Sequence, residues 1–370
     1  MKFPRFLAVA LLSGTIIGAG MFSLPFVVRT LGLGTSALYL VAFAGVYVAI
    51  HRMYAALLET RVDSGQFVKL AEAYLPRRMA PTAGGIILLE LVLVLTIYLI
   101  LAPAFVELVL PGMGIVGAVV FWALGSVALF LKTSWLGWGE AIGVVAILAI
   151  VLAVLAVPAA PFTAPLAQPL SLGVFLLPFG PFLFAFAGRP AVGKAVELAR
   201  AVRASGKPFP LGRVIAWGTA LPAVIYLAFV VGVLRLAPAA GPDAVSSLVG
   251  AAPWLPVTLG TLGLVTLWTS YVIIGVNVEE TLERDLRWKK ALAATVAIAA
   301  PLALYVAGVR EFFTAIGFAG GVFLSLEGIF IVMMWRRAFP HHPWRFASWL
   351  LVPIFLAAIA YEVAHLTGWV

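Results

Sequence analysis

The chain has 370 residues, of which 64% are hydrophobic and only 11% are charged, and its mean hydropathy is +1.12. Soluble domains are about half apolar and about a quarter charged, so this composition excludes a water-soluble globular protein. Disordered and collagen-like chains are also excluded, because the 35 Gly and 24 Pro are scattered through apolar runs without a period. Cysteine is absent, which removes disulfides and thiolate metal sites. The composition therefore predicts an all-α polytopic membrane protein.

Apolar segments long enough to cross a bilayer, about 20 residues each, follow one another along the chain. The first contains the most informative motif of the sequence, so we interpret it as a membrane span and not as a cleaved signal peptide. We predict eleven transmembrane helices near residues 6–31, 35–60, 81–109, 114–131, 134–158, 171–199, 211–237, 255–280, 289–309, 311–335 and 346–367.

The positions of Lys and Arg predict the orientation of these spans. With the N-terminus in the cytoplasm, 20 of the 24 basic residues fall in inner loops. Arg29, Arg235 and Arg310 fall outside, and Arg189 lies within a span. The formal charge of +9 is thus explained by topology and does not require a nucleic-acid partner. We expect a multi-pass protein of the cytoplasmic membrane, with its C-terminus on the extracellular or periplasmic side.

A short amphipathic pattern lies between the second and third predicted spans. Phe67, Leu70, Ala71, Tyr74 and Leu75 recur at the spacing of one helix face. This pattern predicts a short helix lying on the cytoplasmic membrane surface.

Two predicted spans contain helix-breaking residues. The first holds the run SGTIIGAGMFSLP, with Gly14, Gly18 and Gly20, and the sixth holds PFGPFLFAFAGRPAVG. Small residues also permit close helix packing, which is the alternative explanation. The two breaks, however, lie five spans apart, at the first helix of each half of a ten-helix unit. Paired breaks in corresponding halves indicate an inverted-repeat transporter with its substrate site at the membrane midplane.

Several motifs carry a resemblance to a known family. GTIIGAGMFSLPFVV resembles the first span of the aromatic (hydroxy/aromatic) amino acid permeases, and more widely of the amino acid–polyamine–organocation (APC) superfamily. GQFVKLAEAYLP, LFAFAGRPAV and WTSYVIIGVNVEETLERDL are similar to later parts of the same family. The resemblance implies one transporter domain over 1–370 with the LeuT-type fold. It has a first inverted repeat over 1–160, a second over 161–337 and an extra helix over 345–367.

The breaks predict how a substrate would be bound. Unwinding at Gly18, Ala19 and Gly20 frees amides at a helix N-terminus, which suits the carboxylate of an amino acid. Carbonyls freed at the end of the first half of span six suit the ammonium group. The resemblance implies this role for Gly18, Ala19, Gly20, Phe186, Ala187 and Gly188. Phe184, Phe186, Tyr98 and Trp268 are candidates for the side-chain pocket, although packing alone also explains each aromatic residue.

The hydroxyls of span eight predict a site for a coupling ion. Thr266, Thr269 and Ser270, with carbonyls freed at Gly14 and Ile17, would form an oxygen-lined sodium site. The resemblance implies this role for Thr269 and Ser270 in particular. The alternative is that these hydroxyls bond back to their own helix.

Four ionisable residues of the predicted spans are candidates for a proton or charge-pair role, namely Glu90, Glu140, Arg189 and Glu327. Charges at this depth are costly and mark a pathway or a paired site. The carboxylates are therefore candidates for carrying a proton. We expect Arg189, at the break of span six, to pair with one of the deep carboxylates, because an unpaired buried guanidinium would be strongly unfavourable. Arg189 also departs from the pattern of the family that the chain resembles.

These observations predict a secondary active transporter that symports a neutral, apolar or aromatic amino acid with Na⁺ or H⁺. The expected partners are the amino acid and the lipid bilayer; no cofactor is expected apart from Na⁺ as a coupling ion. The alternatives are transport of another small amine or organic cation, and a non-transporting amino acid sensor. An enzyme is not expected, because the four His residues show no metal-ligand spacing. A metal-ion transporter of this fold would need an Asp-Pro-Gly motif in span one, where this chain has Gly-Ala-Gly.

Overall fold

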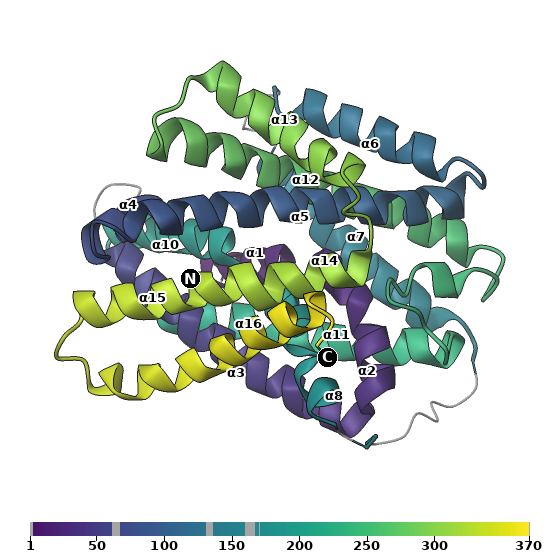
Figure 1. Cartoon of the computed structure of the whole chain (residues 1–370), viewed down its shortest axis with the longest axis horizontal. Coiled ribbons are helices and arrows are strands. Elements are labelled where there is room, and N and C mark those ends of the chain that lie inside the picture. The colour runs from purple at the N-terminus through teal and green to yellow at the C-terminus, as the bar shows by residue number, and fades with distance from the viewer. Residues whose placement is uncertain (1–2, 61–66, 131–135, 160–166, 170, 370) are drawn as a thin grey trace.

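A computed structural model describes residues 3–60, 67–130, 136–159, 167–169 and 171–369. Within these ranges every regular element is a helix (Figure 1). The longer elements are α1 (Phe3–Ile16), α2 (Leu24–Leu31), α3 (Leu33–Glu59), α4 (Phe67–Tyr74), α5 (Ala80–Val109), α6 (Gly114–Ala128), α7 (Leu136–Ala156), α8 (Leu172–Leu176), α9 (Phe179–Phe186), α10 (Arg189–Ala204), α11 (Leu211–Leu236), α12 (Leu255–Glu280), α13 (Lys290–Val306), α14 (Phe312–Phe318), α15 (Ser325–Ala338) and α16 (Val352–Leu366).

Short 3₁₀ and π segments connect or extend several of these helices. The segments used below are η1 (Ala19–Ser23), η4 (Thr281–Asp285), η5 (Ala319–Leu324) and η7 (Ala347–Leu351). Of these, η4 and η5 are π-helical, and η5 joins α14 to α15 without a gap. A π-helical turn inside a span widens the helix and is frequent at functional sites.

The membrane spans follow the prediction in position. Seven helices of the described chain are long and apolar enough to cross a membrane, and a bent pair at the N-terminus makes up to eight. Three shorter apolar helices, Gly114–Ala128, Ala141–Ala156 and Lys290–Val306, lie where the other spans are predicted. The membrane-protein class is confirmed, whereas the total of eleven spans and the division into halves at residue 160 stay predictions.

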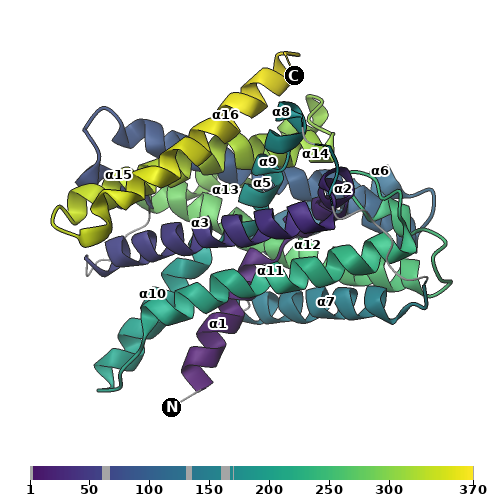
Figure 2. The same cartoon turned by 90° about the horizontal axis from the view of Figure 1, so that it is seen from below.

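The first span is broken, as its glycines predict. The helix α1 ends at Ile16, Gly18 is extended, and the chain re-enters a helix through the 3₁₀ turn η1. The two helical parts are bent by 51° relative to each other. In Figure 2, α1 runs steeply across the helices beside it, and α2 lies beyond the upper end of α1.

The short helix α4 occupies the segment where the amphipathic pattern predicts one. Its apolar residues Phe67, Leu70 and Ala71 are buried, but they pack against α5 and α15. The apolar face thus covers protein and not the membrane surface. A stripe of apolar residues at helical spacing fits either environment, so the pattern alone did not distinguish them.

Long helices enclose the two broken spans. The span α5 runs across the molecule and packs on α12, which in turn packs on α7, while α11 packs on α1 and α3 (Figures 1 and 2). The extra helix α16 packs on α15, η5 and α9. The breaks in the first and sixth spans therefore lie inside the bundle, where α9 contacts η1 directly.

Candidate functional site

The break in the first span leaves backbone donors without helical partners. Among the described residues, the amides of Gly18, Ala19 and Gly20 donate to no backbone carbonyl, and the first bond of the new turn joins the Met21 amide to the Gly18 carbonyl at 3.2 Å. These three amides stand at the N-terminus of η1, where the helix dipole adds positive potential. The segment is therefore built to accept an anionic group.

The break in the sixth span leaves backbone acceptors. The helix α9 ends at Phe186, Ala187 is extended, and α10 begins at Arg189. Pro190 has no N–H group, so it cannot donate to the Phe186 carbonyl four residues earlier. Among the described residues, no backbone amide donates to the carbonyls of Phe186 or Ala187. This segment therefore offers oxygen acceptors opposite the free amides of the first break.

The two breaks face each other across a central cavity of about 80 Å³. It is lined by Gly18, Ala19 and Gly20 from the first break and by Ala187 and Gly188 from the second. The other walls are mostly apolar and come from α5, α9, α12 and the η5–α15 span. They include Leu91, Val94, Tyr98, Phe184, Ile274 and Leu324.

Glycine sets how closely the breaks approach. A β-carbon on Gly20 would lie 2.8 Å from the Cα atom of Ala185, a distance that non-bonded atoms do not tolerate. A β-carbon on Gly18 would meet nothing nearer than the Tyr98 hydroxyl, at 3.9 Å. Gly20 is thus required for contact between η1 and α9, whereas Gly18 borders open space in the cavity.

A tyrosine that the sequence analysis did not single out joins the two breaks. The hydroxyl of Tyr226, on α11, lies 3.0 Å from the Ile16 carbonyl at the end of α1. It also lies 2.5 Å from the Ala185 carbonyl near the end of α9. Tyr226 is fully buried and its ring packs edge-on against Phe186. One tyrosine in an apolar helix carries no distinguishing pattern, so no signal in the sequence marks it.

Two of the predicted pocket aromatics lie elsewhere. The ring of Phe186 is buried against Tyr47 and Tyr226, away from the cavity lining, so only its backbone belongs to the break. Trp268 lines a separate apolar groove between α5, α6 and α12. Tyr98 and Phe184 do line the central cavity.

One wall of the central cavity is charged. Glu90, Arg189 and Glu327 all line it, and the predicted pairing of Arg189 with a deep carboxylate is present, since its Nε atom lies 2.9 Å from Oε2 of Glu327. Glu90 and Glu327 are 5% and 4% exposed. The Oε2 atom of Glu90 has no hydrogen-bond partner among the described residues. Glu140 lies on α7, but its side chain falls outside what the structure describes.

The charged wall holds two carboxyl groups and one guanidinium. These groups are close enough for the two carboxylates to repel each other and for the Arg189 guanidinium to attract both. Tyr54 contacts Arg189 from α3, and the Arg189 guanidinium lies 5.4 Å from the centre of the Phe67 ring. The cluster is electrically neutral only when one of its carboxyls carries a proton. Buried clusters of this kind favour the neutral state because isolated charge is costly there.

A second, smaller cavity of about 40 Å³ lies next to the first. Gly14, Thr266, Thr269 and Ser270 line it, and Tyr98 lines both cavities. Thr269 donates to the Thr266 carbonyl at 3.0 Å, whereas the buried hydroxyl of Thr266 has no partner among the described residues. Ile17, the fifth predicted ligand, is buried but is not part of this lining. Hydroxyl and carbonyl oxygens around an unsatisfied hydroxyl fit a hard cation such as Na⁺.

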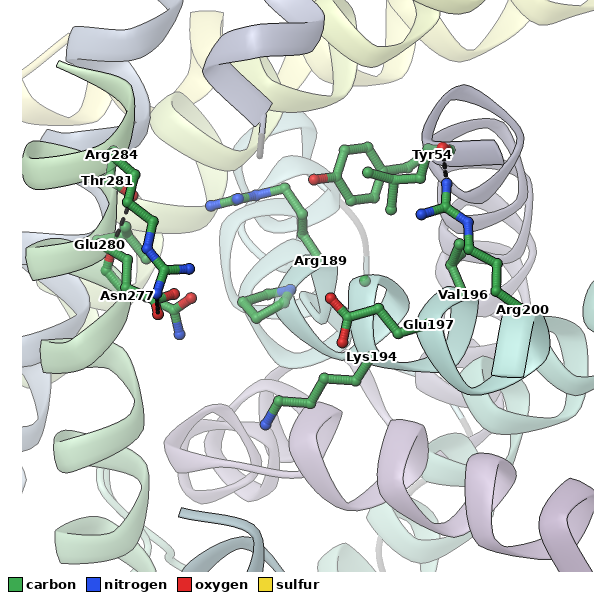
Figure 3. Close-up of a pocket in the computed structure, with 14 residues that line it drawn as sticks. Tyr54, Arg189, Lys194, Val196, Glu197, Arg200, Asn277, Glu280, Thr281 and Arg284 are labelled. Carbon is green, nitrogen blue, oxygen red and sulfur yellow. Dashed lines mark hydrogen bonds and ion pairs between the residues drawn. The ribbon is translucent and has the colours of Figure 1, made fainter. Parts of the chain in front are cut away.

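A larger vestibule of about 310 Å³ opens beyond the charged wall. Figure 3 shows it between Lys194, Glu197 and Arg200 on one side and Asn277, Glu280, Thr281 and Arg284 on the other. Arg189 and Pro190 line both the vestibule and the central cavity. In the predicted topology this vestibule is cytoplasmic, so the Arg189–Glu327 pair stands where a cytoplasmic route meets the central cavity.

The fold occurs in solved structures of transporters. The chain superposes on MhsT, crystallised in complex with L-phenylalanine, with a TM-score of 0.59 and 14% sequence identity over 99% of this chain and 98% of that one. It superposes on the Eremococcus coleocola manganese transporter, bound to an aromatic bis-isothiourea compound, with a TM-score of 0.59 and 16% identity over 98% and 87% of the two chains. No protein-family model and no curated protein matches the sequence. The chain therefore has the LeuT-type transporter fold, as the sequence predicts.

Proposed function

We propose that this protein is a secondary active transporter that carries a neutral amino acid across the cytoplasmic membrane by alternating access, in symport with a cation. The observation that carries the proposal is the pair of opposed breaks around one cavity. Free amides at Gly18, Ala19 and Gly20 bind the substrate carboxylate, and free carbonyls at Phe186 and Ala187 accept from its ammonium group. A zwitterion is the ligand whose two charges match both breaks.

The remaining walls support an apolar or aromatic side chain as the substrate. Tyr98, Phe184 and Leu324 contribute aromatic and apolar surface to the cavity. Small-molecule sites are mostly apolar, with a few polar groups that fix orientation. One structural neighbour was crystallised with L-phenylalanine, which agrees with this substrate class.

Two places in the structure support coupling to a cation. Sodium fits the second cavity, where the Thr266 hydroxyl is unsatisfied and the Gly14 segment precedes the first break. A proton fits the charged wall, where Glu90 has an unpartnered oxygen. Sodium binding would link α1 to α12, and protonation would change the charge of the central cavity itself. Both sites border the first or second break, so either ion would bias the same helices.

The test is uptake by the purified chain in proteoliposomes. A panel of radiolabelled amino acids is offered with a sodium gradient, a proton gradient or neither, and empty liposomes serve as the control. We expect accumulation of an apolar or aromatic amino acid above its equilibrium level under one of the two gradients. Binding without uptake under any gradient would contradict the transporter and favour a sensor.

One observation favours a second candidate, the transport of another small amine or organic cation. Glu90 lines the central cavity, and its carboxylate, whose Oε2 atom is unpartnered, would pair with a cationic substrate. Including lysine, putrescine and a quaternary amine in the uptake panel separates the candidates. Glu90→Gln should abolish uptake of such a cation, whereas uptake of an apolar zwitterion driven by sodium should persist.

A further inference from the structure

A buried carboxyl outside the central cavity has no role in the proposed binding sites. Glu362 lies on α16, the extra helix, and is only 3% exposed. Its side chain enters the crossing between α9 and the α14–η5 span. A β-carbon on Gly180 would lie 2.7 Å from Oε1 of Glu362, and one on Gly317 would lie 2.9 Å from the same oxygen. A β-carbon on Gly321 would overlap the Glu362 side chain itself.

These three glycines form a cradle for the carboxyl. They come from two different spans, α9 and α14–η5, and each lacks the side chain that would occupy the space of Glu362. The Gly317 carbonyl is part of the same surface, since it lies 2.5 Å from the β-position of Gly180. Glu362 therefore meets bare helix backbone on both sides.

No charged partner reaches this carboxyl from the described residues. On its own helix, the other ionisable residues are Tyr361 and His365, whose rings stack on each other. The packed elements α8, α9, α14, η5 and η7 contain no ionisable side chain. On α15, the three charged residues have other partners: Glu327 pairs with Arg189, Arg336 bonds to Arg345 and Ser348, and Arg337 bonds to the Tyr74 carbonyl.

The surroundings suit the neutral acid and not the carboxylate. An ionised group in a membrane span without a cation or a donor is strongly disfavoured. A protonated carboxyl, in contrast, has a hydroxyl to donate, and the Gly317 carbonyl is an acceptor in the same cradle. We propose that Glu362 is a proton-binding site that holds α9 against the α14–η5 span when protonated and loosens this crossing when ionised.

The crossing is connected to the central cavity through backbone contacts. A β-carbon on Gly320 would overlap the Gly180 carbonyl and lie 2.9 Å from the Phe184 amide. Phe184 lines the cavity, and the following residue, Ala185, contacts Gly20 of the first break. A shift of α9 at Gly180 therefore changes the position of the cavity wall. This step rests on the proposed function, and in the predicted topology the proton comes from the external side.

The experiment compares wild type with Glu362→Gln, which keeps the shape of the neutral acid but cannot ionise. Glu311→Gln is the control, because Glu311 is an exposed carboxyl that accepts from the Thr314 amide at the start of α14, so its replacement perturbs the same helix without removing a buried acid. Two readouts need no substrate: the infrared band of a protonated carboxylic acid, and the unfolding temperature in detergent as a function of pH. The third is the rate of amino acid uptake at varied external pH with the internal pH held constant.

We expect an acid band that disappears as pH rises and is missing in Glu362→Gln but present in Glu311→Gln. Wild type and Glu311→Gln should lose unfolding temperature and uptake rate as pH rises, whereas Glu362→Gln should keep its low-pH values. If wild type and Glu362→Gln share the same acid bands and the same pH profile of unfolding, the proposal is overturned. The infrared and unfolding measurements do not depend on transport, so an absence of uptake in every variant would contradict only the proposed function. If Glu362→Gln fails to fold, the same band is sought in Glu90→Gln, which lacks the central carboxyl, and its absence there overturns the proposal.

Discussion

Both broken spans expose backbone groups to the central cavity, but the groups that they expose are different. The first break extends through Gly18 and a 3₁₀ turn, and it presents amides without a charged side chain in the broken segment. The second break is confined to Ala187 and Gly188, and the helix after it begins with Arg189. The first break thus offers a neutral set of donors, whereas the second combines carbonyl acceptors with a guanidinium that Glu327 neutralises.

Under the proposed function, this difference separates substrate recognition from substrate access. The substrate carboxylate would bind to amides at the first break, so its binding would not depend on the charge of any side chain. The second break borders both the central cavity and the vestibule, and Arg189 of the Arg189–Glu327 pair lines both of them. We expect substitutions at the first break to act mainly through shape, and substitutions at the second to act mainly through charge.

Removing the guanidinium at the second break should have the largest effect. Arg189→Met leaves Glu327 buried without its cation, and breaking a buried pair in this way costs about 3–5 kcal/mol in the free energy of unfolding. The double variant Arg189→Met with Glu327→Gln should recover most of this loss. Unfolding in detergent measures both. Arg203→Met is the control, because its pair with Glu59 is 42% and 35% exposed and should contribute about 0–1 kcal/mol.

Adding a methyl group to the first break should have the next largest effect. Gly20→Ala places a β-carbon against the Ala185 backbone, which cannot yield, so we expect a loss of about 3 kcal/mol in the free energy of unfolding. Gly45→Ala should be neutral or slightly stabilising, since nothing lies within 4 Å of a β-carbon there. Gly18→Ala should fold normally yet weaken substrate binding, because its methyl group points toward Tyr98. Equal stability of the Gly20 and Gly45 variants would contradict the close contact of η1 with α9.

Removing the hydroxyl that joins the two breaks should have a smaller effect. Tyr226→Phe leaves the Ile16 and Ala185 carbonyls without their side-chain donor, and an unsatisfied buried acceptor costs about 2 kcal/mol. The uptake rate should fall as well, because α1 and α9 lose their common anchor. Tyr39→Phe is the control, since its bond to the Phe175 carbonyl is exposed. A Tyr226→Phe protein with the stability and uptake of Tyr39→Phe would show that the two breaks are positioned independently.

The second cavity gives the smallest effect and tests whether the first break is linked to an ion. Thr266→Val removes one oxygen with little change in shape, and we expect about tenfold weaker apparent sodium affinity, equivalent to about 1.4 kcal/mol. The measurement is the sodium dependence of uptake or of the unfolding temperature. Thr295→Val, at an exposed position of α13, should leave it unchanged. If neither uptake nor the unfolding temperature of the wild-type protein depends on sodium, the sodium site is contradicted and the proton at the charged wall is the coupling ion.

The helix breaks were predictable because Gly and Pro act locally on the backbone. Pro190 removes a donor whatever surrounds it, and the glycines at positions 18 and 20 disfavour a continuous helix because glycine loses more conformational freedom in a helix than other residues do. Arg189 was predicted to need a carboxylate, because burial of an unpaired guanidinium is costly in any fold. Which carboxylate it pairs with depends on how α10 and α15 pack, and the sequence does not contain that information directly.

Side-chain directions were harder to predict, since these spans are apolar on all faces. In α12, Thr266 lines the second cavity, Trp268 lines another groove and Thr269 borders both, and periodicity does not reveal this rotation in a uniformly apolar helix. Phe184 and Phe186 lie two residues apart in α9 and therefore point in different directions. Glu362 lies within the last predicted span and could have been singled out as an intramembrane carboxylate, whereas its cradle of glycines from two distant segments, α9 and α14–η5, was not predictable.

The shared hydroxyl of Tyr226 has a consequence for the energy of motion. A hydroxyl has one proton, so at any instant only one of the carbonyls of Ile16 and Ala185 receives it. When α1 and α9 move apart, the proton stays with one carbonyl and the number of hydrogen bonds is unchanged. The junction of the two breaks therefore has two arrangements with the same number of hydrogen bonds. Rotation about the C–O bond of the Tyr226 side chain exchanges one arrangement for the other.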